Sequence, residues 1–168
     1  MKITVTKTVG MLIAMATLVG MPVRARSDET VTPHKSASKA VATPRLVTLS
    51  ATDTMRFDPA TIQAKRGERL RVVLKPTSAM PKIAMAHNFV ILKPGSDAAA
   101  FANASAMARP DFLAPALKNQ VLVSTPVAGG GETVSAEFTA PAKPGSYAFI
   151  CTFPGHFATG MKGVLLVK

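Results

Sequence analysis

Apolar and polar residues alternate in short runs along most of the chain after residue 45, and proline or glycine separates the runs. In residues 70–75 (LRVVLK), every second side chain is apolar and two cations fall on the opposite face, which predicts a half-buried strand. Residues 131–138 (GETVSAEF) repeat this alternation. Six further short segments are predicted strands: residues 46–51, 61–64, 87–92, 121–124, 147–151 and 163–167.

About eight short strands spaced by turns predict an all-β sandwich or barrel instead of a parallel α/β sheet. One segment departs from this pattern, because Asp97–Ala108 is rich in alanine, follows a candidate N-cap at Ser96 and ends before Pro110. It is predicted to be a short helix inserted between strands. The glycines at 129–131 are predicted to form a turn, since no strand and helix flank them as a phosphate-binding loop requires.

The first 25 residues differ in character from the rest. Lys2 and Lys7 precede an apolar run over residues 9–23, and Val23-Arg24-Ala25 has small residues spaced for signal peptidase. Residues 1–25 are therefore predicted to be a signal peptide that directs the protein to the periplasm. The alternative is an uncleaved anchor that holds the protein at the membrane, but the apolar run falls short of the roughly 20 residues of a spanning helix.

The next segment, residues 26–45, is rich in Ser, Thr, Lys and Pro without an apolar period, and is predicted to be a flexible linker. Residues 46–168 would then form one domain. Residues 1–25 contain three of the 20 Lys and Arg and none of the 9 Asp and Glu, so their removal lowers the net charge from +11 to about +8. Such a charge favours acidic partners or an anionic membrane surface, or serves solubility alone. Export and the lack of basic-aromatic motifs argue against nucleic acid.

Metal-binding side chains are concentrated near the C-terminus. Cys151, His156 and Met161 lie in one segment between two predicted strands, with the spacing Cys-x4-His-x4-Met. His87 stands at the start of its own predicted strand, 64 residues before the cysteine, where a sandwich could bring it against that segment. Cys151 is the sole cysteine, so no internal disulfide explains the thiol.

Each of these residues alone has an ordinary structural explanation, as a buried thiol, a solvated histidine or a packing methionine. Their combination is typical of a blue copper site, in which two imidazoles and one thiolate surround copper and a methionine binds weakly along the axis. Soft sulfur suits Cu(I), and imidazole suits both oxidation states. His87, Cys151, His156 and, weakly, Met161 are therefore the predicted ligands of one type 1 copper.

Two segments of the chain resemble the copper-binding segments of azurins and auracyanins, which belong to the cupredoxin family. CTFPGH at 151–156 resembles their C-terminal copper loop, and MAHNFV at 85–90 resembles the strand that supplies their first histidine. The insertion at 97–120 and the GGGET turn at 129–133 fall where azurins have a helical flap and a comparable turn. The resemblance implies a Greek-key β-sandwich of about eight strands over residues 46–168.

The same resemblance implies supporting roles for further residues. Asn88 would tie the two ligand segments together, and the backbone N–H of Phe153 would tune the thiolate. Ala86 stands where azurins usually have a glycine whose carbonyl approaches copper, which implies at most a weak contact here. Two more features depart from azurin: the histidine-to-methionine spacing is one residue longer, which is closer to auracyanin, and Phe89 stands where azurin has a tryptophan.

The predicted function is one-electron transport by Cu(II)/Cu(I) cycling in a monomer that is not an enzyme. His156, Pro154 and Phe157 would form the electron port, where an apolar rim surrounds a partly exposed edge of the His156 imidazole. Such a rim suits brief contacts with a redox donor and acceptor, such as a c-type cytochrome or an oxidase or reductase. The alternative is a periplasmic copper-binding or copper-delivery protein with the same ligands. A multicopper enzyme is disfavoured, because such enzymes need several domains and more than the three histidines present.

Overall fold

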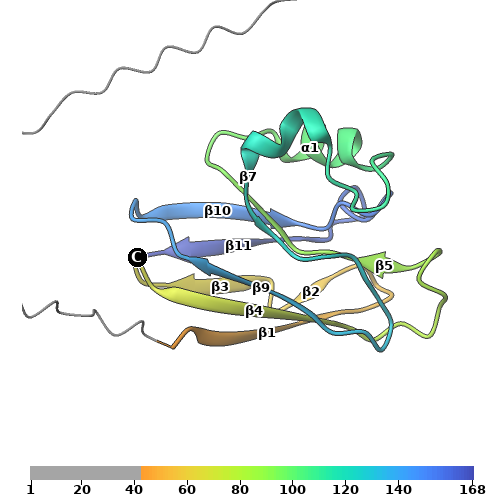
Figure 1. Cartoon of the computed structure of the whole chain (residues 1–168), viewed down its shortest axis with the longest axis horizontal. Coiled ribbons are helices and arrows are strands. Elements are labelled where there is room, and N and C mark those ends of the chain that lie inside the picture. Colours follow the sequence, from red (N-terminus) through yellow and green to blue (C-terminus); the bar gives the residue numbers. More distant parts are fainter. Residues whose placement is uncertain (1–42) are drawn as a thin grey trace, which may run out of the picture. The chain divides into compact units, whose positions relative to one another are not determined.

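Two β-sheets pack face to face in the computed structural model of the chain, which describes residues 43–168 (Figure 1). One sheet has the strand order β2-β1-β4-β9 and the other β3-β11-β10-β6-β7, while β5 and β8 pair separately. The all-β sandwich predicted from the sequence is confirmed. The strands are β1 Arg45–Ala51, β2 Phe57–Asp58, β3 Thr61–Ala64, β4 Arg69–Pro76, β5 Ala86–His87, β6 Val90–Leu92, β7 Val121–Ser124, β8 Ala128–Gly129, β9 Val134–Thr139, β10 Gly145–Ile150 and β11 Lys162–Val167.

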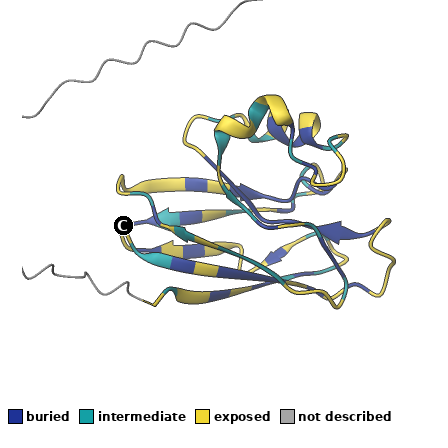
Figure 2. Cartoon of the chain, in the orientation of Figure 1, coloured by how far each residue is buried: buried dark blue, intermediate teal, exposed yellow. Residues whose placement is uncertain are grey.

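Strands adjacent in sequence often lie apart in the sheets. β1 pairs with β4 in parallel along its whole length, and β11 pairs with β3 in parallel, whereas the other ladders are antiparallel. Buried and exposed residues alternate along β1 and β3, so each strand turns one face inward (Figure 2). The apolar residues of this alternation therefore fill the space between the two sheets.

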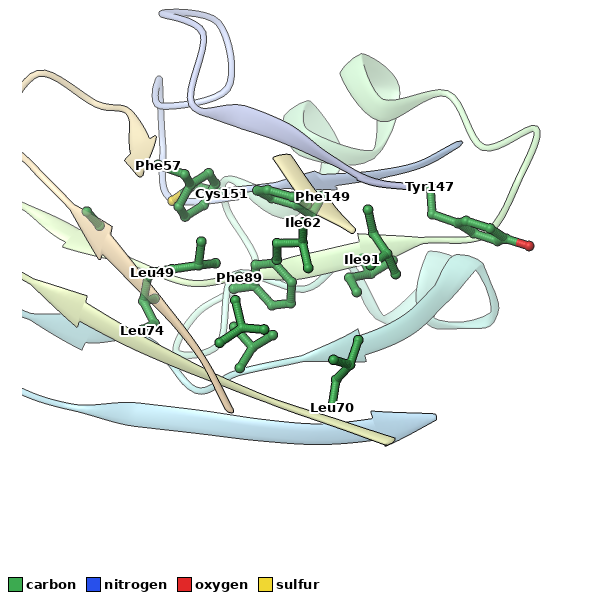
Figure 3. Packing of buried hydrophobic residues seen from close by; sticks show 14 of the residues in the cluster. Leu49, Phe57, Ile62, Leu70, Leu74, Phe89, Ile91, Tyr147, Phe149 and Cys151 are labelled. Atoms are coloured by element: carbon green, nitrogen blue, oxygen red, sulfur yellow. The ribbon is translucent and has the colours of Figure 1, made fainter. Parts of the chain in front are cut away.

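The core between the sheets is aliphatic with an aromatic group at its centre (Figure 3). The rings of Phe57 and Phe89 lie 5.4 Å and 5.0 Å from that of Phe149, and all three residues are at most 3% exposed. Offset and edge-to-face contacts of this kind add to the free energy of burial. Cys151 joins the same core beside Phe57, so this predicted ligand is anchored in the packed interior.

The predicted strand over residues 87–92 is interrupted. β5 pairs with β8, whereas β6 pairs with β7 and β10. Between them, the N–H of Phe89 donates to Thr125 Oγ1 at 3.0 Å and its carbonyl accepts from Thr125 N at 2.9 Å. A continuous strand was therefore the wrong prediction, because the backbone leaves the sheet to meet a loop side chain. The two-residue strands β2 and β8 were missed, since such short pairings have no sequence period.

The helical insertion consists of α1 (Ala98–Ser105) and a 3-10 helix, η1 (Pro115–Gln120). Helix α1 packs Phe101 and Ala102 against Val90 and Ile150, so it covers the five-stranded sheet (Figure 1). Its N-cap is Asp97 and not the predicted Ser96. The Asp97 carboxylate accepts from Ala99 N and Ala100 N at 2.9 Å and 3.0 Å, because an ionised acceptor suits the positive end of a helix.

The signal peptide predicted at residues 1–25 lies outside the described residues, as does nearly all of the linker predicted at 26–45. The first described strand begins at Arg45, next to the predicted start of the domain. Within residues 43–168, no helix combines the length and the apolar character needed to cross a membrane.

Candidate metal centre

Three side chains meet at one end of the sandwich. His87 ends β5, Cys151 follows β10 directly, and His156 lies in the segment that connects β10 to β11, residues 151–161, which we term the ligand loop. One ligand atom from each lies within 4.8 Å of the other two. His87 and Cys151 are fully buried, and His156 is 3% exposed. The group could therefore hold a metal ion that water does not reach freely.

Met161 completes this group from the end of the ligand loop. Its Sδ lies 3.2 Å from His87 Nδ1, and Cys151 Sγ lies 3.5 Å from His156 Nδ1. The imidazole rings of His87 and His156 are 4.8 Å apart. All four sequence-predicted ligands are thus brought together, and their donor atoms form a soft set of two sulfurs and two imidazole nitrogens. Such a set suits copper better than magnesium or calcium.

Backbone hydrogen bonds make the ligand loop compact. His156 N donates to Phe153 O at 3.1 Å, and Met161 N donates to His156 O at 2.9 Å. Cys151 N donates to Met161 O at 3.1 Å and closes the loop where it leaves the sheet. Gly155 has a φ of 82°, a left-handed conformation that glycine adopts at little cost. These hydrogen bonds and the turn at Gly155 therefore shape the ligand loop so that its donor atoms face inward.

The Cys151 thiol is buried in apolar surroundings, which raises its pKa to about 11. Backbone N–H groups of Asn88 and Phe153 bond to the sulfur and act in the opposite direction, because they stabilise the thiolate. The group fits a metal cation, whose charge would compensate the desolvated thiolate. These two N–H groups belong to the residues that the resemblance assigned to thiolate tuning and loop tethering.

Burial also lowers the pKa of the two histidines to about 4. At His87, the Asp53 carboxylate opposes this effect, whereas at His156 the charge of His87 adds to it. Both imidazoles are thus neutral near pH 7 and retain a lone pair for a metal. His87 Nδ1 faces Met161 Sδ, whereas His87 Nε2 is buried without a hydrogen-bond partner among the described residues.

Asn88 ties the segment after His87 to the ligand loop. Its Oδ1 accepts from Thr152 N at 2.8 Å, and its Nδ2 donates to Thr152 Oγ1 at 2.8 Å. The Thr152 hydroxyl in turn donates to the carbonyl of Phe112 in the helical insertion. Sequence reasoning missed Thr152, although its place directly after the cysteine and its hydrogen-bonding side chain were the available signals. Ala86 lies fully buried in the β5–β8 ladder, opposite Gly129.

An apolar rim surrounds His156. The Phe153 ring lies 4.9 Å from the His156 ring, Pro154 is exposed, and Phe157 is half-buried with Lys162 Nζ 5.4 Å from its ring centroid. The sequence predicted a partly exposed imidazole edge, but only 3% of His156 is accessible because the neighbouring rings cover it. Beside the rim, Phe153 lines a pocket of about 550 Å³ together with Arg109 and other residues.

The chain is similar in sequence and in structure to known copper proteins. Residues 45–168 match the family of copper binding proteins described as the plastocyanin/azurin family. Auracyanin-A from Chloroflexus aurantiacus is 38% identical over 117 residues, which cover 68% of each chain. The copper-resistant cuproprotein CopI from Rubrivivax gelatinosus is 37% identical over 144 residues, or 86% of this chain and 79% of CopI. The solved structure of auracyanin A, a "blue" copper protein, has a TM-score of 0.67 and 35% identity, covering 75% of this chain and 100% of that one.

Proposed function

The chain belongs to the plastocyanin/azurin family of copper-binding proteins, and from this premise we propose that it is a type 1 blue copper protein that carries single electrons. His87, Cys151 and His156 are the proposed principal ligands, Met161 is the weak axial ligand, and the Ala86 carbonyl is at most a weak further contact. The observation that carries this proposal is the buried convergence of two imidazoles and a thiol within 4.8 Å.

Copper, when bound at such a site, supplies one-electron chemistry by cycling between Cu(II) and Cu(I). The protein contributes a set of donors that both states tolerate and that the fold holds in place. Asn88 links the two ligand segments through Thr152, while N–H groups of Asn88 and Phe153 stabilise charge on the sulfur. Because the four donor side chains are buried, the site favours electron transfer over the binding of a substrate.

Electrons would enter and leave through the rim of His156, Pro154 and Phe157. The apolar character of this rim suits a small interface that releases its partner after each transfer. The proposed partners are a redox donor and acceptor, such as a c-type cytochrome or an oxidase or reductase. We propose that the carrier works as a monomer in the periplasm, to which residues 1–25 would direct it; retention of those residues would instead attach it to the membrane.

Copper binding provides the direct test. Cu(II) is added to the purified mature domain, and the visible absorption is compared with that of Cys151→Ser, which keeps the size of the side chain but removes the sulfur. The wild type should develop an intense blue thiolate-to-copper band that the variant lacks. A colourless wild-type protein would overturn the proposed function.

The similarity to CopI favours a second function, copper binding or delivery, since that relative is a copper-resistant cuproprotein and matches 86% of this chain. The same ligands would then retain or pass on copper instead of electrons. Mixing the reduced, copper-loaded protein with a Cu(I) chelator separates the two. A carrier should be reduced and reoxidised repeatedly while it keeps its copper, whereas a delivery protein should lose Cu(I) rapidly.

A further inference from the structure

A turn far from the ligand loop in sequence holds that loop from outside. The turn joins β1 to β2 and comprises residues 52–56. Arg56 Nη1 donates to the carbonyl of Thr159, in the ligand loop, at 2.6 Å. The same nitrogen lies 2.9 Å from the carbonyl of Met55 and 3.4 Å from that of Thr54, within its own turn. One guanidinium group thus bridges two segments that are 103 residues apart.

The bridged carbonyl stands just before the proposed axial ligand. Four residues separate His156 from Met161, and Thr159 is the third of them. Its N–H donates to Gly155 O at 3.1 Å, and its hydroxyl donates to His156 O at 2.8 Å. Both hydrogen-bond donors of Thr159 are therefore bonded within the ligand loop, whereas the Thr159 carbonyl accepts from Arg56.

The packing around the guanidinium supports a fixed contact. Gly160 has a φ of 103°, and a Cβ added there would lie 3.2 Å from two atoms of the Arg56 guanidinium. The hydroxyl of Thr159 also lies 3.3 Å from Met55 Sδ. A side chain at position 160 would push against the bridge, so the glycine allows the turn and the ligand loop to approach closely.

We propose that Arg56 is a positioning residue that sets the place of Met161 by holding Thr159. The inference rests on the proposed function in one respect, namely that Met161 faces copper. A weak axial bond cannot by itself determine where the thioether lies, so the surrounding protein must do so. A charge-assisted hydrogen bond to the backbone two residues away is a suitable restraint.

The first test uses copper-free protein and so does not depend on the metal. In Arg56→Met, amide hydrogen exchange at Gly160 and Met161 should be about tenfold faster than in the wild type, because one charge-assisted hydrogen bond that protects the loop is lost. Amides of β4 should keep their exchange rates. The matched control is Arg45→Met, which removes a bridging arginine bonded to Gln63 O and Glu68. Unchanged exchange in the ligand loop would overturn the proposal.

The second test reads the copper site. Cu(II)-loaded Arg56→Met should keep its blue band, because His87 and Cys151 adjoin paired strands and His156 N is bonded to Phe153 O. Its electron paramagnetic resonance spectrum should nevertheless change in rhombicity as the axial thioether moves. Arg56→Lys should restore part of the wild-type spectrum, since an ammonium group can still reach the Thr159 carbonyl. Identical spectra in all three proteins would overturn the proposal. A wild type that binds no copper would instead reject the proposed function and leave the exchange result valid.

Discussion

Asn88 is not a proposed ligand, but its hydrogen bonds connect the segment after His87 with the ligand loop. It is fully buried, it exchanges two hydrogen bonds with Thr152, and its backbone N–H bonds to the Cys151 sulfur. A buried amide of this kind is costly unless every polar atom has a partner. Its hydrogen bonds therefore help to set the distance between His87 and the ligand loop, together with the pairing of β6 with β10.

Replacing Asn88 by Ala should destabilise the protein by about 1–3 kcal/mol, because the N–H of Thr152 would be left buried without its acceptor. Denaturant unfolding of the copper-free protein measures this loss. Asn119→Ala, in the exposed part of η1, is the matched control and should change stability little. Equal effects of the two substitutions would contradict the role of Asn88 as a tether.

The buried histidines predict how acid affects the copper-free protein. Burial lowers the pKa of His87 and His156 to about 4, whereas an unfolded imidazole titrates near 6.5. Between these values the unfolded chain binds more protons than the folded one, so the free energy of unfolding should fall as the pH drops from about 6.5 towards about 4. Urea unfolding across this range measures the trend. In His156→Gln the pH dependence should be clearly shallower, and a wild type with constant stability would contradict the prediction.

At the scale of elements, β10 and β11 carry the ligand loop between them, and their close pairing determines where it begins and ends. Gly163 in β11 lies opposite Phe149 in β10. A Cβ at this glycine would lie 2.2 Å from the Phe149 ring and 2.4 Å from the Ala60 carbonyl. The Phe149 ring can therefore pack against β11 only because position 163 has no side chain.

Gly163→Ala should consequently lower stability by about 1–3 kcal/mol or more, since either the ring or the backbone of β11 must move. Thermal unfolding of the copper-free protein gives the loss. Val164→Ala, at the more exposed neighbouring position, provides the control and should have a much smaller effect. A stable Gly163→Ala variant would indicate that the ring and strand have room to relax.

The rim of the ligand loop provides a second test at this scale. Pro154→Glu places a charge on the exposed rim without entering the core, so it should slow electron exchange with a redox protein while leaving the blue spectrum nearly unchanged. Stopped-flow reduction by a c-type cytochrome is the measurement. Pro144→Glu, in the exposed turn before β10, is the matched control. Equal rates for the two variants would argue against an electron port at the rim.

At the scale of the whole molecule, the candidate metal centre joins segments that are far apart in sequence. Its residues come from β5 and from the ligand loop, and Arg56 and Asn88 attach further segments to it. A metal ion bound there would cross-link these segments in the folded state. Copper binding and unfolding should therefore be strongly coupled.

Copper at about a thousand times its dissociation constant should stabilise the protein by about 4 kcal/mol, with a matching rise in Tm. Calorimetry of the copper-free and copper-loaded forms measures the shift. In Cys151→Ser the shift should nearly vanish, because the thiolate ligand is lost. A large shift in the variant would mean that copper stabilises the protein elsewhere.

The sequence by itself determined the class of fold and the chemistry of the candidate site. Alternation of apolar residues over segments such as 70–75 reflects burial of one strand face, and this local period survives folding. The ligand loop places Cys151, His156 and Met161 within eleven consecutive residues, so their proximity needed only a turn between two strands. His87 was found as a histidine at the start of its own predicted strand, and the resemblance of residues 85–90 to a known segment supported it.

Only the tertiary structure decided how the loop is held. The strand predicted at 87–92 breaks because Phe89 bonds to Thr125, and Arg56 binds a carbonyl 103 residues away. His156 is almost closed to water because the rings of Phe153 and His87 pack against it. Such contacts depend on which segments the sheets bring side by side, and no local pattern of polar and apolar residues encodes that arrangement.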